Sequence, residues 1–87
     1  MIPRIKSFET NDNWKLTIVF DDGLCVSYDV KNDIDNIDDF KTLISDTNLW
    51  NMAQLDTSRT CIYWNDRIDL PSDILYEYGV PLSQNYK

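Results

Sequence analysis

The chain has 87 residues, with 15 acidic and 8 basic side chains and a net charge of −7 at pH 7. This length allows one domain with one modest core, and a hydrophobic content of 43% is enough to fold it. The lysines and arginines are scattered, so the clusters on which non-specific nucleic-acid binding rests are missing. Only Arg4 and Lys6 form a small basic spot. We expect a single domain over residues 1–79, a frayed tail over 80–87 and no direct contact with nucleic acid.

The N-terminal residues lack the apolar segment of a signal peptide, and no run approaches 18 apolar residues. These features predict a cytoplasmic protein that does not enter a membrane. In that compartment Cys25 and Cys61 are expected to be reduced and packed rather than joined in a disulfide.

The first predicted strand covers Arg4 to Glu9, with Ile5 and Phe8 facing inward across a bulge. Asn11-Asp12-Asn13 is the polar turn after it. Pro3 limits pairing at its start and the charges of Arg4 and Lys6 discourage aggregation, so this strand is expected to be an edge of the sheet. An exposed edge offers backbone groups to a partner strand or to a second copy of the chain.

A hairpin is predicted next, because hydrophobic residues alternate on both sides of Asp21-Asp22-Gly23. Trp14, Leu16, Ile18 and Phe20 share one side of the first run, and Leu24, Val26, Tyr28 and Val30 share one side of the second. Gly23 supplies the positive φ angle that such a turn requires.

Residues 31–39 follow neither the period-two pattern of a strand nor the 3.6-residue pattern of a helix, and they predict a solvated connection. Asp33 to Asp39 resembles a calcium loop, but it lacks the central glycine, places Ile37 where an oxygen ligand belongs and has no distal glutamate. From Asp38 the pattern becomes helical, with Phe40, Leu43 and Ile44 on one face and Asp38 or Asp39 as the N-terminal cap. We expect a short helix here and no metal site.

The second half predicts another hairpin, from Trp50 to Leu55 and from Thr60 to Trp64. Pro71-Ser72-Asp73 then opens a helix that carries Ile74, Leu75 and Tyr78 and ends at Gly79. The order is β-β-β-α-β-β-α. It favours an α+β fold, with an antiparallel meander-type sheet of about five strands and two short helices on one face.

Chemical motifs are few. Histidine is missing, and two glycines cannot build a phosphate-binding loop. Asp66, Asp69 and Asp73 are a possible acid–base or metal group, but structural roles are favoured: Asp66 in a turn, Asp69 capping N–H groups near the helix start, and Asp73 in the first helical turn. The chain is therefore expected not to be an enzyme and to hold no cofactor.

The tryptophans are also expected to be structural. Trp50 and Trp64 are placed in the core rather than in a ligand platform, and Trp14, at the start of a strand, is expected to be the most exposed of the three.

Several segments together resemble one known family. They are Leu16 to Phe20, Asp21-Asp22-Gly23, Phe40 to Leu43, Ile62 with Trp64, Ile68-Asp69-Leu70 and Leu75-Tyr76. The chain resembles the small bacterial domain-of-unknown-function family 2442 from Ile2 to about Tyr78. It departs from that pattern at Asn65-Asp66-Arg67, where the family more often has proline before the turn and glycine at its end.

The resemblance implies an α+β domain without an established activity. Some family members carry an added helix-turn-helix domain, and others lie beside another small protein in two-gene modules reminiscent of toxin–antitoxin pairs. We expect a non-catalytic protein-interaction module, the acidic partner of a small basic protein. The alternative is a ligand-binding or regulatory domain associated with a DNA-binding element. A small molecule bound in a pocket lined by Trp50 and Trp64 would favour this alternative. The candidate interaction residues are Arg4, Lys6, Trp14, Trp64, Asp66, Asp69 and Tyr76.

Overall fold

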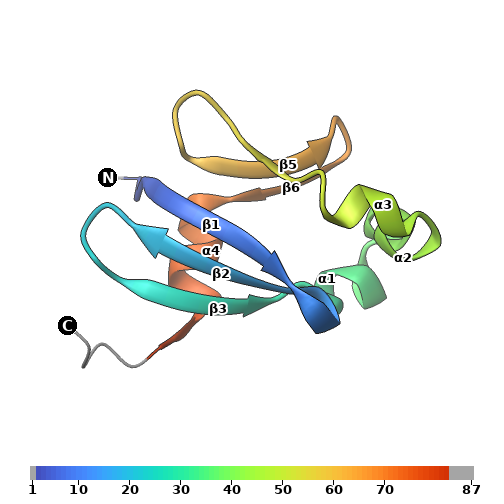
Figure 1. The fold of residues 1–87 in the computed structure, drawn as a ribbon, viewed down its shortest axis with the longest axis horizontal. Helices are drawn as coiled ribbons and strands as arrows, with labels where there is room; N and C mark the ends of the chain where they lie inside the picture. The colour runs from blue at the N-terminus through green and yellow to red at the C-terminus, as the bar shows by residue number, and fades with distance from the viewer. Residues whose placement is uncertain (1, 83–87) are drawn as a thin grey trace.

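The computed structural model describes residues 2–82, which form an α+β fold of antiparallel strands and short helices (Figure 1). In chain order its elements are β1 (Ile5–Asn11), the 3-10 helix η1 (Asp12–Trp14), β2 (Lys15–Phe20), β3 (Cys25–Asp29), α1 (Lys31–Asn36), the 3-10 helix η2 (Asp38–Lys41), α2 (Thr42–Ser45), α3 (Thr47–Trp50), β4 (Gln54–Leu55), β5 (Cys61–Asn65), β6 (Ile68–Pro71), α4 (Ser72–Tyr78) and β7 (Val80–Pro81).

The strands form two sheets instead of the single sheet of about five strands that the sequence predicted. One sheet has the order β1-β2-β3-β7 and the other has the order β4-β5-β6. In Figure 1, α4 passes behind the first sheet, while α2 and α3 gather at one end of the molecule. Among residues 2–82, no helix is both long and apolar enough to cross a membrane.

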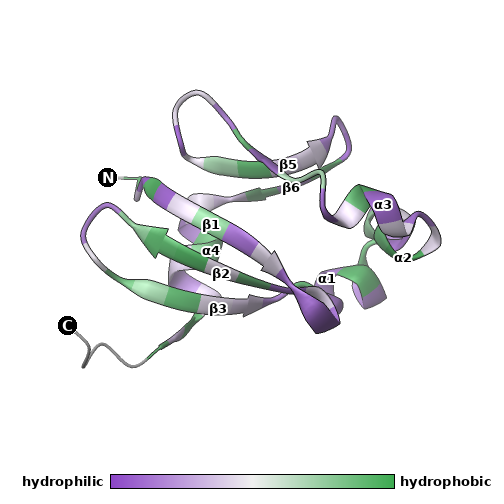
Figure 2. Ribbon diagram, in the orientation of Figure 1, coloured by the Kyte–Doolittle hydropathy of each residue, from purple (hydrophilic) through white to green (hydrophobic). Residues whose placement is uncertain are grey.

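The predicted hairpin of β2 and β3 is confirmed, except that Trp14, which was predicted to start its first strand, belongs to η1. Buried positions alternate with half-buried or exposed ones along both strands, and Gly23 has a φ of 95° in the turn between them. The bulge in β1 is also confirmed, because the register shifts between Ile5 and Ser7. Figure 2 shows hydrophobic segments along β2 and β3 and a hydrophilic turn between β1 and β2.

The second sheet differs from the prediction in two places. Residues 68–71 form β6, a strand that the sequence reading did not include, with Ile62 opposite Leu70 and Tyr63 opposite Asp69. The predicted strand from Trp50 to Leu55 is only two residues long, because Trp50 ends α3 and only residues 54–55 pair with β5. Each of these strands is too short for period-two alternation to reveal it.

The predicted solvated connection at 31–39 was wrong, because its first six residues form α1. The carboxylate of Asp29 accepts a hydrogen bond from the Lys31 N–H at 2.9 Å, and the Ile34 side chain is buried. The carbonyl of Ile34 accepts a hydrogen bond from the Lys41 ammonium at 2.9 Å. One buried isoleucine and these polar contacts hold a helix that the hydrophobic pattern did not predict.

The following helix was placed correctly, but its details differ. It begins as η2, whose N-cap is Ile37 with no side-chain hydrogen bond, so the expected cap by Asp38 or Asp39 was wrong. Phe40 and Leu43 are buried, whereas Ile44 is 48% exposed. Because a 3-10 turn has three residues rather than 3.6, the side chains that follow are rotated relative to the predicted helical face.

The closing helix begins where it was predicted, after Pro71. Ser72 is fully buried: its N–H donates to the Thr60 carbonyl at 2.8 Å and its hydroxyl donates to the Pro3 carbonyl at 2.6 Å. Leu75 is buried as expected, but Ile74 and Tyr78 are exposed.

The expected frayed tail was wrong at its start, because Val80 and Pro81 form β7, opposite Ser27 and Val26 of β3. The remainder of that expectation, at residues 83–87, lies outside the described residues.

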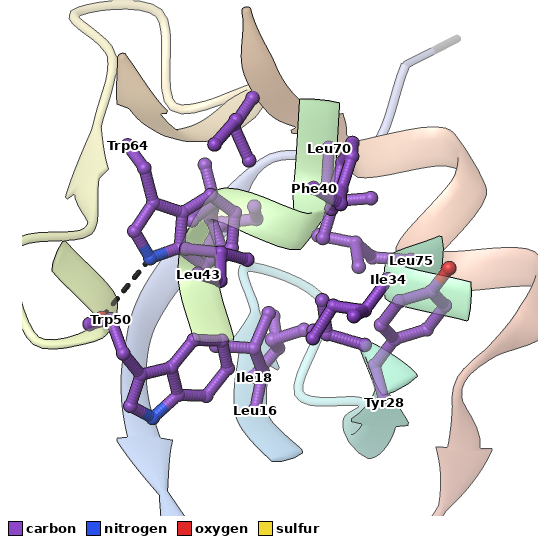
Figure 3. Close-up of a cluster of buried hydrophobic side chains, with 14 of the residues drawn as sticks. Leu16, Ile18, Tyr28, Ile34, Phe40, Leu43, Trp50, Trp64, Leu70 and Leu75 are labelled. Carbon is purple, nitrogen blue, oxygen red and sulfur yellow. Dashed lines mark hydrogen bonds between the residues drawn. The ribbon is translucent and has the colours of Figure 1, made fainter. Parts of the chain in front are cut away.

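Both sheets and the helical segments contribute to one hydrophobic core (Figure 3). Trp64 is 6% exposed and Trp50 is 7% exposed, so the prediction that both are core residues is confirmed. Their rings stack with centroids 5.6 Å apart, and the Trp64 indole N–H donates to the Trp50 carbonyl at 3.0 Å. Trp14 is half-buried and meets the Trp50 ring edge-on.

Candidate functional site

A depression of about 480 Å³ lies beside the turn between β2 and β3. We call it the turn groove, and it is lined by Pro3, Arg4, Phe20, Asp21 and Asp22. Tyr76 of α4 is bonded to this lining. Its ring meets the edge of the Phe20 ring with centroids 4.8 Å apart, and its hydroxyl donates to the Asp22 carboxylate at 2.5 Å.

Asp22 orders one side of the turn groove. One of its oxygens accepts the Tyr76 hydroxyl and the other accepts the Leu24 N–H at 2.9 Å. The hydrogen bond from Tyr76, followed by the one from Leu24, lowers the pKa of the Asp22 carboxyl. The same bond raises the pKa of the Tyr76 hydroxyl. The aromatic ring is therefore held in one orientation by a charged acceptor.

Asp21 and Arg59 connect the two sheets at this end of the molecule. The guanidinium of Arg59 donates to both oxygens of Asp21, at 2.7 and 2.9 Å, and to the Ile5 carbonyl at 3.1 Å. Hydrogen bonding to Arg59 lowers the pKa of Asp21 and raises the pKa of Arg59. Such two-pronged pairs fix geometry as well as charge.

Arg59 was missed by the sequence analysis. It lies in the connection between β4 and β5 and has a φ of 62°, an uncommon value for a residue other than glycine. Its N–H donates to the Asp56 carbonyl at 3.0 Å, and its own carbonyl accepts the Ile5 N–H at 2.8 Å. No local pattern signals this role, because the carboxylate that Arg59 binds is 38 positions away in the sequence.

The bases that the sequence analysis singled out also lie here. The positive charges of Arg4 and Lys6 contribute to the lowered pKa of Asp21. Both residues are exposed, and neither forms an ion pair within 4 Å with another of residues 2–82. The two acids of the turn groove are already bonded to Arg59 and Tyr76, so the uncommitted charge beside it is positive.

The remaining candidates are not part of this site. Trp64 is buried in the core, Asp66 lies in the turn between β5 and β6, and Trp14 lies beside a different depression. Asp69 is exposed on β6, and the N-cap of α4 is Pro71 without a side-chain hydrogen bond. The expected cap by Asp69 was therefore wrong, because the added strand β6 separates this residue from the helix start.

The carboxylates expected as an alternative acid–base group are not assembled. Residues 2–82 contain no group of three or more histidine, cysteine, aspartate or glutamate side chains that could hold a metal ion. Asp73 hydrogen-bonds the N–H of its neighbour Ile74 at 2.9 Å. The turn that contains Asp66 is held by Asn65, whose side chain accepts from the Arg67 and Ile68 N–H groups.

Acid is expected to destabilise the protein through two carboxylates of the turn groove, Asp21 and Asp22, and through Asp56 in the connection between β4 and β5. The folded-state pKa values of Asp21, Asp22 and Asp56 lie below their ordinary value of 3.8. Above that value the carboxylates are charged in both states and their contribution is fully present. As the pH falls below about 4, the unfolded chain binds protons first, so the free energy of unfolding decreases until the folded-state pKa values are passed.

Denaturant melts between pH 5 and pH 2 measure this loss, with pH 7 as the reference. Tyr76→Phe removes the hydrogen bond to Asp22 and keeps the ring, so its stability should depend less steeply on pH than that of the wild type. If the free energy of unfolding falls equally steeply with pH in the two proteins, the bond between Tyr76 and Asp22 does not contribute to the acid dependence.

In comparisons with protein-family models, curated proteins and solved structures, no match to this chain was found. The resemblance to family 2442 therefore stays a prediction.

Proposed function

We propose that this chain is a non-catalytic protein-interaction module that binds its partner protein at the turn groove. The observation that carries the proposal is the exposed ring of Tyr76, which the buried Phe20 ring and the Asp22 carboxylate hold beside the turn groove and two uncommitted bases. Tyrosine and arginine are among the residues that contribute most to protein–protein affinity. Ile2, next to Pro3 in the chain, adds apolar surface because it is 61% exposed.

The turn groove is organised before a partner arrives. Asp22 holds the Tyr76 hydroxyl, and Arg59 holds Asp21 with two hydrogen bonds. Side chains that are already ordered lose less entropy on binding than free ones, so each contact contributes more to affinity. This supports recognition rather than catalysis, because both carboxylates of the turn groove are already engaged, Asp21 by Arg59 and Asp22 by Tyr76.

The charges support a definite partner chemistry. Arg4 and Lys6 suit a partner segment that places an apolar side chain in the turn groove and a carboxylate beside it. At long range the net charge of −7 attracts a protein that is basic overall. Much of this charge lies between residues 29 and 46, where there are six aspartates and two lysines. A small basic protein, such as the second product of a two-gene module, combines both requirements.

The edge of β1 is a weaker candidate for the partner surface. Its position at the edge of the sheet is confirmed. However, Arg59 already bonds the N–H and carbonyl of Ile5, and the Trp50 indole N–H bonds the Asn11 carbonyl. Because backbone groups at both ends of β1 are already hydrogen-bonded and a bulge follows Ile5, only a short part of the strand remains for pairing with a partner strand. Pairing at this edge stays a prediction.

The experiment begins with co-purification of the tagged chain from its native host and identification of the protein that accompanies it. The dissociation constant for that protein is then measured by calorimetry with the wild type, with Arg4→Glu and with Tyr76→Ala. We expect each variant to weaken binding about tenfold or more, which corresponds to about 1.4 kcal/mol.

Asp66→Ala, a change in an exposed turn at another place, is the matched control and should bind like the wild type. Circular dichroism verifies that each variant is folded. The partner site is not at the turn groove if both groove variants bind like the wild type, or if the control variant loses binding. A chain that purifies alone from its native host and binds no basic protein would overturn the function.

A further inference from the structure

A second depression, of about 210 Å³, lies at the turn between β1 and β2. Its lining combines two indole rings with short polar side chains, and we call it the indole–amide pocket: Thr10, Asn11, Asp12, Asn13, Trp14, Trp50 and Asn51. It shares no lining residue with the turn groove. Its outer rim is the hydrophilic turn seen between β1 and β2 in Figure 2.

The backbone is strained at the rim of this pocket. Asn13 has a φ of 64° and Trp14 has a φ of 62°. Asparagine tolerates this left-handed conformation, but for a bulky residue such as tryptophan it is an outlier that the surrounding structure must impose. Outliers of this kind gather at functional sites, and an observed one is a reason to look for a function.

Two contacts hold Trp14 in this conformation. Its carbonyl accepts the Val30 N–H at 2.9 Å, and its ring meets the Trp50 ring with centroids 5.2 Å apart at an angle of 77°. Trp50 in turn stacks on the buried Trp64 (Figure 3). The half-buried indole of Trp14 is thus supported from behind by a rigid aromatic row, and it remains in reach of solvent at the pocket.

The polar groups of the pocket leave several bonding positions free. Asn11 donates its amide to Thr17, so its side-chain oxygen remains an acceptor. Asn51 accepts from Thr10, so its amide N–H groups remain donors. The side chains of Asp12 and Asn13 form no hydrogen bond with another of residues 2–82. Acceptors and donors therefore border the same small space.

The charges around the pocket favour an uncharged ligand. Asp12 disfavours an anion such as a phosphate. Lys15 is not part of the lining, but it lies opposite Asn11 in the register of β1 and β2, so its positive charge reduces the attraction of Asp12 for a cation. A volume of about 210 Å³ is below the roughly 300–1,000 Å³ typical of sites for drug-sized ligands, so a single ring fits best.

We propose that the indole–amide pocket binds one uncharged sugar ring. Sugar hydroxyls both donate and accept, which matches the free acceptors of Asp12 and Asn11 and the free donors of Asn51. The C–H groups of a sugar ring carry partial positive charge and suit the electron-rich face of an indole such as Trp14. This proposal does not depend on the partner protein or on the turn groove.

The test is a nuclear magnetic resonance titration of the ¹⁵N-labelled chain with glucose, galactose, mannose and N-acetylglucosamine. With at least one of these sugars, we expect amide shifts confined to residues 10–14 and 50–51, and a dissociation constant on the order of millimolar. Asp12→Ala should weaken binding about tenfold or more, because it removes a charged acceptor. Trp14→Ala should abolish binding, and Trp14→Phe should restore part of it.

Asp12 is exposed and makes no internal hydrogen bond, so its variant tests the site even if Trp14→Ala does not fold. Asp66→Ala is the control and should keep the wild-type affinity. The proposal is overturned if none of the four sugars shifts these amides at about 50 mM, well above a millimolar dissociation constant. It is also overturned if Asp12→Ala binds like the wild type, or if inorganic phosphate or methylammonium produces the shifts in place of the sugars.

Discussion

Replacing Trp64 with alanine is expected to lower the free energy of unfolding by about 3–5 kcal/mol. The side chain is 6% exposed, its ring stacks on Trp50, and its indole N–H is bonded to the Trp50 carbonyl. Alanine therefore leaves a cavity, removes the stacking partner of Trp50 and leaves a buried carbonyl without its donor. Chemical denaturation followed by circular dichroism measures the loss.

Trp64→Phe separates the ring from the hydrogen bond. It keeps an aromatic side chain against Trp50 and removes the N–H, so its loss of stability should be clearly smaller than that of Trp64→Ala. The core assignment fails if Trp64→Ala is as stable as the wild type. If Trp64→Phe is as destabilised as Trp64→Ala, then the hydrogen bond rather than the stacked ring dominates the effect.

The parts of the fold that were predicted correctly are those with long local patterns. The hairpin of β2 and β3 combines strict alternation with a glycine turn, and the closing helix combines proline at its start with glycine after its end. In both cases the signal extends over several residues and agrees with the local backbone preference. The bulge in β1 was also predictable from a local pattern. Side chains alternate along a strand, so Ile5 and Phe8 can both face the core only if the strand contains one extra residue between them.

The second sheet was not predictable from local patterns. The strands β4 and β6 have two and four residues, and their pairing with β5 is a tertiary event. Because β6 was not foreseen, Asp69 was placed at a helix start instead of on a strand. Trp50 was assigned to a strand for a similar reason: its burial comes from stacking on Trp64, and a large buried ring gives no indication of whether its backbone is helical.

The candidate sites were predictable only as separate residues. Arg4, Lys6 and Tyr76 were selected, yet nothing in the sequence places Tyr76 against Phe20 or joins Asp21 to Arg59. The hydrogen bond between Tyr76 and Asp22 joins residues 54 positions apart in the chain, and that between Arg59 and Asp21 joins residues 38 positions apart. A pocket lined by Trp50 and Trp64 would have favoured the alternative function, although both residues were predicted to lie in the core. These two rings stack on each other in the core, and it is Trp14 that lines a depression together with Trp50.

Gly79→Ala is expected to lower the free energy of unfolding by about 1–3 kcal/mol through overpacking. A Cβ at this position would lie 2.6 Å from the Leu75 carbonyl oxygen and 2.6 Å from a methyl group of Val26. The backbone of Gly79 is extended, with a φ of −66°, so an alanine has no conformational penalty there. The strain must instead be relieved by moving the end of α4 away from β3, which pulls on the short pairing of β7 with Val26 and Ser27.

Gly23→Ala provides the opposite case and serves as the matched control. At that position a Cβ would meet no atom within 4 Å, but φ is 95°, so the cost is conformational and amounts to about 1 kcal/mol. Hydrogen exchange distinguishes the two variants. Gly79→Ala should accelerate exchange of the Leu82 amide, which bonds the Cys25 carbonyl, whereas Gly23→Ala should change only the turn. A fully stable Gly79→Ala protein with unchanged exchange would show that α4 and β3 are not packed as closely as this contact requires.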